Sequence, residues 1–310
     1  MSEVFPDLDN RLRSWLLSGD AGRQATLFLA STTVFFLIGA APALALQYEL
    51  LTPRGDRFSA ETYGALFTMH GLFMMHLFLL PAVFGVLGNR SIGRRGAFPR
   101  LGLLGWYLHL GGGLVLSFVL VSGGVATGFA FGYVPPAARG LVKAAQLGSA
   151  LAVAGVLATA VNPVLAAVRR RRIPPVPRRG RRRVAGAGVA ALLVIGGLLA
   201  SPGWGPLRGT YFEVAVWHLL GGAGLAIYFT HLRGAQHGSA ADRTRTAGLL
   251  LLCLPQLVMG ALEAPRRYHE YAVNLQGWQV ISALGGVLLT AGCCLSFWSV
   301  LSARRPTGSP

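Results

Sequence analysis

Residues 63–88 read YGALFTMHGLFMMHLFLLPAVFGVLG, an apolar run without a single Asp, Glu, Lys or Arg. A helix of roughly 20 apolar residues spans the hydrocarbon core of a bilayer, which is about 30 Å thick. The run is continuous rather than alternating, which excludes a strand of a transmembrane β-barrel. The stretch therefore predicts a membrane-spanning helix, and it places His70 and His76 inside it.

The composition of the whole chain agrees with this reading. Of the 310 residues, 53% are hydrophobic and only 13% are charged, and 28 Lys and Arg against 11 Asp and Glu give a formal net charge of +17. Such a composition excludes a soluble globular enzyme and a disordered chain. It also argues against a nucleic-acid binder, because the basic residues do not lie on a foldable soluble module. Cys253, Cys293 and Cys294 lie in apolar runs, so neither a disulfide framework nor a zinc site is predicted.

Eight apolar runs are long enough, or nearly long enough, to span a membrane. We therefore expect an all-α, multi-pass transmembrane helical bundle over residues 25–303, preceded by a cytoplasmic segment 1–24 and followed by a cytoplasmic tail 304–310. The predicted spans cover residues 25–48, 63–88, 101–125, 144–168, 184–201, 211–232, 246–263 and 276–301.

The basic residues orient these spans, because Lys and Arg are enriched in cytoplasmic loops. With both termini in the cytoplasm, most basic residues lie on the inner side. The richest segment is the loop 169–183, which we interpret as a stop-transfer loop that can also contact anionic lipid. The outer segments hold only Arg54, Arg57, Arg139, Lys143, Arg208, Arg266 and Arg267.

Two histidines lie at equal predicted depth in different spans. His70 follows Tyr63 by seven residues and His218 follows Tyr211 by seven, and both spans run from outside to inside. At 1.5 Å per residue, both lie about 10 Å below the outer surface. Ionisable side chains inside a membrane are costly, so they indicate function, and this pair could hold a haem iron from both faces. The alternative is that each is a core or interfacial histidine; the remaining candidates, which fit a ligand role less well, are His76, His109, His231, His237 and His269.

Two adjacent arginines support a haem near the outer face. Arg266 and Arg267 precede the last span in an outer segment that is otherwise poor in arginine. A haem has two propionates, which adjacent guanidinium groups at the interface can neutralise. The alternative is an ordinary interfacial arginine pair.

Three stretches, in chain order, resemble subunit I of the haem–copper oxidases, the cytochrome c oxidase family. They are SAETYGALFTMHG at 59–71, GTYFEVAVWH at 209–218 and APRRY at 264–268. The resemblance covers nearly all of residues 20–300. It implies that His70 and His218 ligate a low-spin haem.

The departures from the family pattern imply a reduced activity. Val216 stands where the family has the ligand of its high-spin, oxygen-reducing haem, and the copper-ligand motifs are missing. The resemblance also implies that the family's fifth to eighth helices are missing. Gln47 replaces an arginine that contacts haem A in the family, which favours haem B.

Together these features predict a membrane-bound cytochrome with one bis-histidine low-spin haem, no copper and no catalytic residue of its own. Six-coordinate iron implies one-electron transfer in a respiratory-type chain. Cytochrome c or a quinol would donate electrons, and other membrane redox subunits would accept them. We expect it in the cytoplasmic (inner) membrane of a bacterium, with the haem near the periplasmic face. Two alternatives stay open: a haem-less structural or assembly subunit, and an enzyme that oxidises quinol or cytochrome c, although Val216 argues against an oxidase.

Overall fold

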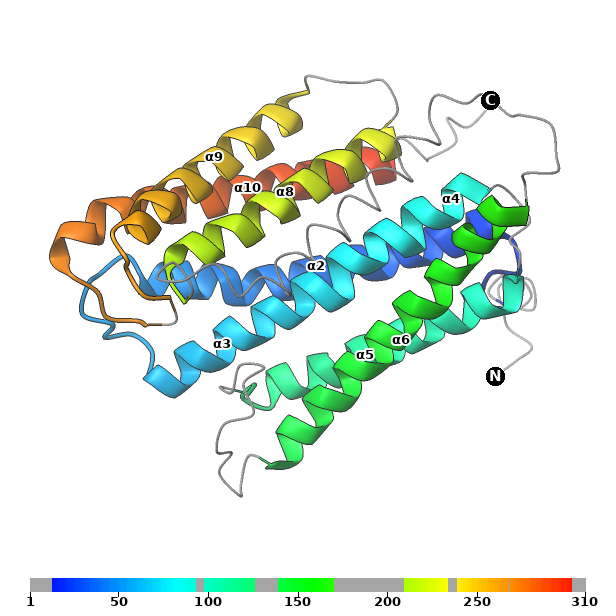
Figure 1. Cartoon of the computed structure of the whole chain (residues 1–310), viewed down its shortest axis with the longest axis horizontal. Helices are drawn as coiled ribbons and strands as arrows, with labels where there is room; N and C mark the ends of the chain where they lie inside the picture. The colour runs from blue at the N-terminus through cyan, green and yellow to red at the C-terminus, as the bar shows by residue number, and fades with distance from the viewer. Residues whose placement is uncertain are drawn as a thin grey trace, which may run out of the picture.

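The computed structural model describes residues 13–92, 98–125, 139–169, 209–233, 239–266 and 268–302. The regular structure in these ranges is almost entirely helical, with an isolated β-bridge between Thr210 and Pro265. Helices α8, α9 and α10 form one group and α5 and α6 another, with α2 and α3 between them (Figure 1). The elements are α2 (Ala21–Glu49), α3 (Ala60–Leu72), the π-helical stretches η1 (Phe73–Leu79) and η2 (Ala82–Gly88), α4 (Asn89–Ile92), α5 (Pro99–Val121), α6 (Arg139–Arg169), α8 (Tyr211–Arg233), α9 (Ala240–Ala261), the 3₁₀ turn η6 (Val273–Leu275) and α10 (Gln276–Ser302).

Six stretches of helix in the described ranges are long and apolar enough to cross a membrane. They are Ala21–Glu49, Ala60–Gly88, Pro99–Val121, Arg139–Asn162, Ala240–Ala261 and Val273–Val300. The predicted all-α membrane bundle is therefore confirmed. Helix α8 covers the sixth predicted span, whereas the fifth, at 184–201, and most of the loop 169–183 lie outside the described residues. The count of eight spans and the side of the termini stay predictions.

Several helices begin before the apolar run that predicts them, because a polar residue caps the first turn. The Asp20 carboxylate accepts a hydrogen bond from Arg23 N at 2.9 Å, and α2 begins at Ala21. Ser239 Oγ accepts from Asp242 N at 3.2 Å, and α9 begins at Ala240, six residues before the predicted span. Capping satisfies amide groups that have no partner inside the helix. Hydropathy alone cannot detect these polar turns.

Glycines bring α5 and α6 into backbone contact. A Cβ added at Gly112 would lie 2.5 Å from the carbonyl oxygen of Gly148, and one at Gly155 would lie 2.5 Å from that of Gly105. The two glycines of each helix are seven residues apart, so they lie on one face of it. Small residues on facing sides let membrane helices pack at short distance. At these glycine positions the pair of helices therefore has no room for larger side chains.

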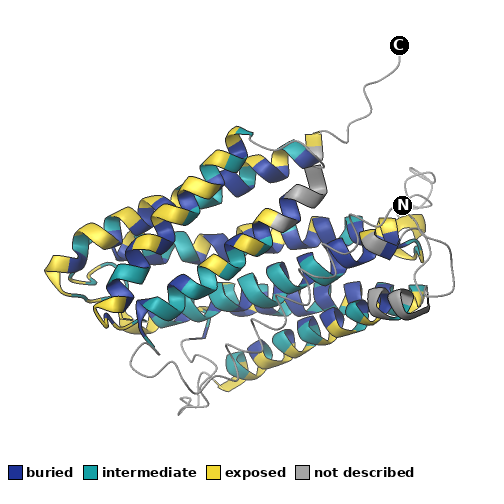
Figure 2. Ribbon diagram, turned by 45° about the horizontal axis from the view of Figure 1, so that its top comes forward, coloured by how far each residue is buried: buried dark blue, intermediate teal, exposed yellow. Residues whose placement is uncertain are grey.

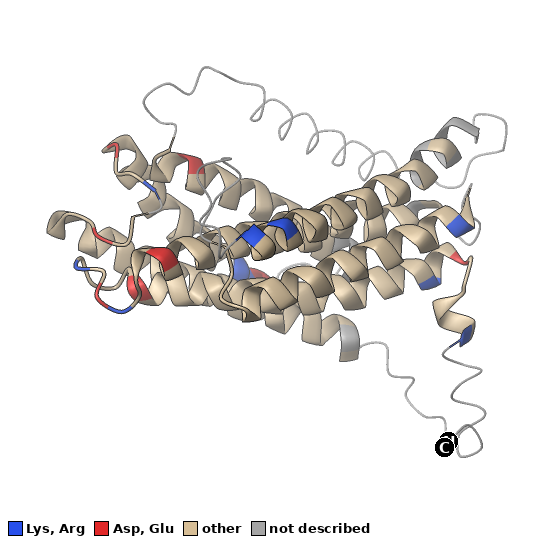
Figure 3. Ribbon diagram, turned by 90° about the horizontal axis from the view of Figure 1, so that it is seen from below, with Lys and Arg blue, Asp and Glu red and all other residues tan. Residues whose placement is uncertain are grey.

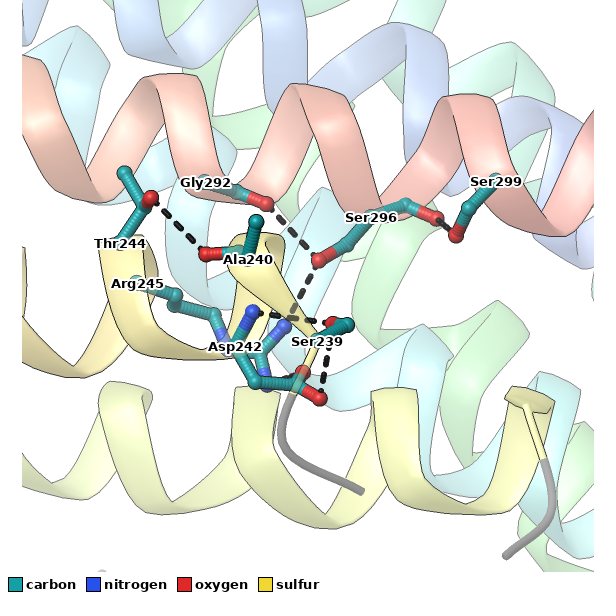
Figure 4. A network of polar contacts seen from close by, with 8 residues as sticks. All are labelled: Ser239, Ala240, Asp242, Thr244, Arg245, Gly292, Ser296 and Ser299. Atoms are coloured by element: carbon teal, nitrogen blue, oxygen red, sulfur yellow. Dashed lines mark hydrogen bonds and ion pairs between the residues drawn. The ribbon is translucent and has the colours of Figure 1, made fainter. Parts of the chain in front are cut away.

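The buried arginine Arg245 ties α9 to both of its neighbours, and Figure 4 shows its contacts with Asp242 and with Ser296 of α10. Its Nη1 donates to Ser296 Oγ of α10 at 2.8 Å, and its Nη2 lies 2.8 Å from Asp242 Oδ1. Its guanidinium carbon lies 4.7 Å from the ring centre of Phe229 in α8. A buried charge is tolerated when it is paired and hydrogen-bonded. Helices α8, α9 and α10 are thus joined at one end.

Charge differs between the two ends of the bundle. Figure 2 shows the buried residues where helices face one another, and Figure 3 shows that most of the described helical residues are uncharged. We call the end at which α2 and α5 begin the basic end. Among the described residues it holds Arg13, Arg23, Arg90, Arg100, Arg243 and Arg245 with Asp20 and Asp242, whereas the opposite end holds Arg54, Arg57, Arg139, Lys143 and Arg266 with Glu49, Asp56, Glu61, Glu213, Glu263 and Glu270. This asymmetry agrees with the predicted orientation.

The side chain of Asn162 provides a test of the packing at the basic end. Its Oδ1 accepts from Phe98 N at 2.6 Å and its Nδ2 donates to Phe98 O at 2.8 Å, which fixes the turn before α5. We expect Asn162→Ala to lower the free energy of unfolding by about 1–3 kcal/mol, because two backbone groups lose their partner. Equilibrium unfolding in mixed micelles, followed by circular dichroism, measures this change. The exposed Asn274→Ala is the matched control, and equal stability of the two variants would contradict the prediction.

Candidate functional site

The structure brings His70 of α3 and His218 of α8 together inside the bundle. Their ring centres are 6.3 Å apart, and the ring planes are inclined by 35°. Tyr63 and Tyr211, each seven residues earlier on the same two helices, also contact each other through their hydroxyl groups. Two contacts with equal spacing show that α3 and α8 run parallel and in register at this level. The two histidines therefore lie at the same height in the bundle.

The ring of His70 is oriented by the backbone of α2. Its Nδ1 lies 2.9 Å from the carbonyl oxygen of Gly39, so Nδ1–H donates this hydrogen bond. A Cβ at Gly39 would lie 2.6 Å from Cβ of Phe73, so the glycine permits the close approach of the helices. Pro42 lies one turn further along α2 and removes a helical hydrogen bond from the turn that contains Gly39. The hydrogen bond of His70 therefore ties α3 to the backbone of α2.

The ring of His218 is oriented by a side chain of α9. Its Nδ1 lies 3.0 Å from Gln256 Oε1, which is an acceptor, so Nδ1–H is again the donor. Gln256 Nε2 in turn donates to Ser282 Oγ of α10 at 3.3 Å, and Ser282 Oγ donates to Leu252 O at 3.3 Å. Because the amide nitrogen is held by Ser282, the amide oxygen faces His218. Three helices therefore cooperate to set the orientation of one imidazole.

These hydrogen bonds determine which nitrogen of each histidine can bind a metal. A neutral imidazole whose Nδ1 carries the proton presents a lone pair on Nε2. Metal-bound histidines usually donate their other N–H to a carbonyl or carboxylate, which is the arrangement found for both rings. His70 and His218 thus have the outer-shell contacts of metal ligands.

The spacing of the two rings fits a haem iron held from both faces. A metal–imidazole bond is about 2.0 Å long and the ring centre lies about 1.1 Å behind the bonded nitrogen, so two opposed ligands have ring centres about 6.2 Å apart. The observed spacing is 6.3 Å. A Cβ at Gly71, beside His70, or at Gly221, one turn after His218, would meet no atom of the chain within 4 Å. No atom of the chain therefore crowds the backbone at these two positions beside the pair.

A second polar cluster lies nearer the end opposite the basic end. Gln279 Nε2 of α10 donates to the hydroxyl oxygen of Tyr211 at 2.8 Å, and Tyr211 contacts Tyr63. In the adjoining loop, Tyr271 donates to Leu50 O at 2.7 Å, and burial raises the pKa of this phenol, so it keeps its proton. The cluster joins α2, α3, α8 and α10 about two turns from the histidine pair. It was not predicted from the sequence, because its members come from four separate helices and loops.

Arg266 belongs to the loop between α9 and α10, and its side chain lies beside the start of α8. Its Nη2 is 2.9 Å from Glu213 Oε1, and its backbone N–H donates to Gly209 O at 2.9 Å. Glu213 precedes His218 by five residues and also accepts from Gly209 N at 3.1 Å. Arg267 lies outside the described residues. The predicted contact of these two arginines with haem propionates stays a prediction.

The described contacts of His109 and His269 lie away from the pair. His109 is fully buried on α5, with its ring centre 5.5 Å from that of Phe28 and 5.3 Å from that of Phe35. His269 lies in the loop before α10, 3.9 Å from Glu270. His76 lies on η1, one and a half turns beyond His70, while His237 and the side chain of His231 lie outside the described part of the chain. Within that part, no group of three or more His, Cys, Asp or Glu side chains is placed to hold a bare metal ion.

Two residues with a positioning role, Gly39 and Gln256, were not predicted as site residues. A polar glutamine inside the apolar run of α9 was a usable signal, because polar groups in a membrane span need a partner. For Gly39 no comparable signal exists, because the group that matters is its backbone carbonyl. Both partners are far from the histidines in sequence, by 31 and 38 residues.

Comparisons with known proteins agree with the resemblance found in the motifs. A family model described as cytochrome c and quinol oxidase polypeptide I matches residues 23–179. A cytochrome c oxidase subunit 1-beta of Streptomyces coelicolor is 39% identical over 133 residues, which is 41% of this chain and 23% of that protein. A cytochrome c oxidase subunit 1 of Corynebacterium glutamicum is 32% identical over 163 residues, or 50% of this chain and 28% of the relative. The matched segments thus span less than a third of these relatives, and His218 lies beyond the family-model match.

Proposed function

Because this chain belongs to the cytochrome c and quinol oxidase polypeptide I family, we propose that it is a shortened, membrane-bound cytochrome of that family. It binds one low-spin haem between His70 and His218 and transfers electrons without reducing oxygen itself. One observation carries the proposal: the two rings are 6.3 Å apart, and each has its Nδ1–H bonded to an acceptor. The spacing suits one iron between two Nε2 atoms.

When bound, a six-coordinate haem supplies one-electron transfer, because its iron has no open position for a substrate. The residues of this chain hold both ligands in place before and after that transfer. Gly39 fixes the ring of His70, and Gln256 with Ser282 fixes the ring of His218. Rigid ligands keep the reorganisation on oxidation and reduction small. Donation from Nδ1–H to an acceptor also makes each imidazole a stronger electron donor.

The residue two positions before His218 supports the absence of an oxygen-reducing centre. In the family this position carries the ligand of the high-spin haem, and here it is Val216. An isopropyl side chain has no lone pair and cannot bind iron or copper. A second, high-spin haem in this chain would therefore need an iron ligand from another residue. We propose that the protein holds no copper.

Aromatic packing towards the basic end supports haem B rather than a haem with a long isoprenoid tail. Phe78 lies two turns beyond His70, and Tyr228 lies about three turns beyond His218. With three further rings they form a buried cluster whose neighbouring ring centres are 4.9–6.5 Å apart. The space between the helices on this side is thus filled with side chains. The other members of the cluster are Phe36, Phe229 and Phe297.

We also propose that electrons enter from the end opposite the basic end and leave to another subunit. Arg266 lies at that end, 20% exposed, and uses one arm of its guanidinium on Glu213. A guanidinium has five N–H donors and can bind more than one acceptor, so we propose that Arg266 also contacts a haem propionate. Cytochrome c or a quinol is the proposed donor. The acceptor is another redox subunit of the membrane, since one haem near one face does not conduct across the bilayer alone.

The test is the haem content of the full chain purified in detergent. We expect one haem per chain in a pyridine haemochrome assay, a reduced-minus-oxidised spectrum of a low-spin cytochrome, and the mass of haem B after extraction. No haem in protein expressed with ample haem supply would overturn the proposal and leave the structural or assembly subunit. A spectral change on adding carbon monoxide would instead indicate an open iron position and a catalytic centre.

The hydrogen bond between Gln256 and His218 gives a prediction that is specific to the site. We expect Gln256→Leu to weaken haem binding by about 10–100-fold, because outer-shell partners of this kind contribute that much to metal affinity. The reduction potential should rise, because an imidazole without this bond donates less charge to iron. Haem titration and redox potentiometry measure both effects.

Gln276→Leu is the matched control for this prediction. Gln276 is a half-buried glutamine whose Nε2 donates to a backbone carbonyl, Leu51 O, at 3.1 Å, and it contacts neither histidine. It should leave haem affinity and potential unchanged. If both variants changed the haem equally, Gln256 would have no specific role.

A further inference from the structure

A groove opens at the basic end of the bundle, between the N-terminal segment and the start of α5. Its volume is about 720 Å³, within the range of ligand pockets. It lies far along the helices from the histidine pair and contains no haem-site residue. The groove is lined by Leu17, Gly19, Phe98, Pro99, Arg100, Leu101, Leu103 and Leu104.

The two walls of this groove are held at a fixed distance by buried hydrogen bonds. Gln24 Nε2 donates both to Ser18 O in the N-terminal wall, at 3.0 Å, and to Pro99 O in the α5 wall, at 2.8 Å. Tyr107 donates to Leu16 O at 2.9 Å and attaches the N-terminal segment to α5 a second time. The Gln24 side chain is almost fully buried, so solvent does not compete for these bonds. The groove is therefore formed in advance of any ligand.

The lining of the groove is apolar and open to the surroundings. Leu17 is 70% exposed, Phe98 42% and Leu104 50%. Trp15, on the same N-terminal segment, is 40% exposed. Aromatic residues of this kind concentrate where the acyl chains meet the headgroups of a membrane. Their position places the groove at the boundary of the bilayer.

The charge around the groove is positive. Arg100 belongs to the lining and is exposed, and Arg23, in the first turn of α2, has its guanidinium carbon 5.5 Å from the ring centre of Trp15. Asp20 is the acidic residue next to Gly19, and its carboxylate is engaged as the cap of α2. Among the described residues, the acidic group nearest in sequence to the groove is thus already used as a helix cap, and an apolar groove beside arginine matches a molecule with an acyl chain and an anionic headgroup.

We propose that this groove binds one anionic phospholipid of the leaflet at the basic end. An acyl chain lies along Leu17, Phe98 and Leu104, and the phosphate contacts Arg100. A partner helix would cover the apolar wall but would leave Arg100 without an anion. The bound lipid ties the N-terminal segment to α5 and to the membrane surface.

Native mass spectrometry of the full chain tests this proposal. The protein is released from detergent with equal amounts of phosphatidylglycerol and phosphatidylcholine that carry the same acyl chains. We expect one phosphatidylglycerol to be retained after the other lipids have dissociated. Arg100→Gln should lower its apparent affinity about fivefold, in keeping with about 1 kcal/mol for each basic residue near an anionic surface. Arg100→Lys should restore most of it.

Matched variants separate this site from general electrostatic attraction. Arg243→Gln removes an exposed arginine from the same end of the bundle but outside the groove, and it should leave the retained lipid in place. Leu17→Gln should lower retention, whereas Leu262→Gln, at the opposite end and 60% exposed, should not. Equal loss from Arg100→Gln and Arg243→Gln, or equal retention of phosphatidylcholine, would overturn the proposal. So would a co-purifying protein segment that occupies the groove in place of lipid.

Discussion

His70→Ala and His218→Ala are each expected to abolish haem binding, with a loss of affinity of more than about 100-fold. Each variant removes one of the two proposed iron ligands, and the carbonyl of Gly39 or the amide of Gln256 loses the ring that it orients. The measurement is the haem-to-protein ratio of the purified chain, together with its reduced spectrum. His269→Ala, in the loop before α10, is the control and should keep its full haem content.

Rescue by a small molecule distinguishes a lost ligand from a misfolded bundle. In His70→Gly and His218→Gly, free imidazole should enter the cavity left by the side chain and restore the low-spin spectrum. Circular dichroism should show unchanged helix content in all four variants. If one histidine could be replaced without loss of haem, its ligand role would be refuted and His76 would become the next candidate.

Gly112→Leu is expected to destabilise the bundle by about 3 kcal/mol or more, because overpacking forces a backbone shift. Already the first atom of the new side chain would lie 2.5 Å from the carbonyl oxygen of Gly148, and this atom belongs to the backbone of α6. The helices α5 and α6 would have to separate along their length. Thermal unfolding in detergent, followed by circular dichroism or by a thiol-reactive dye, measures the effect.

The neighbouring glycine provides the control for this experiment. A Cβ at Gly111 meets no atom within 4 Å, so Gly111→Leu adds the same side chain to the same helix without a clash. Its stability should stay within about 0.5 kcal/mol of the parent chain. Similar melting temperatures for the two leucine variants would show that the α5–α6 contact does not have the geometry described.

Much of the fold could be predicted because membrane insertion depends on local composition. The apolar runs at 63–88 and 276–301 identify their helices without any knowledge of the neighbours. The first residue of each helix is less predictable. Capping side chains such as Asp20 and Ser239 are polar, and hydropathy does not identify them. The histidine pair could be predicted because His70 and His218 follow Tyr63 and Tyr211 at the same spacing. Since the two spans run in the same direction, equal spacing implies equal depth.

The partners of the site residues could not be predicted from the sequence in the same way. Arg266 shows the difference: the sequence predicts a partner for a haem propionate, and the structure places it in an ion pair with Glu213. That pair forms because the loop before α10 folds back on the start of α8, where Tyr211 N donates to Ala264 O at 3.0 Å. A loop contact between segments fifty residues apart leaves no periodic signal in either segment.

The sequence by itself determined that this chain is an all-α membrane protein of the oxidase subunit I family, and it singled out His70 and His218. These properties follow from hydropathy, charge and motifs, each of which is contained in one short segment. Only the tertiary structure decided that the two rings are 6.3 Å apart and that Gly39 and Gln256 orient them. The physical reason is that a hydrogen bond or a ring spacing depends on how closely separate helices pack, which glycines such as Gly39 permit.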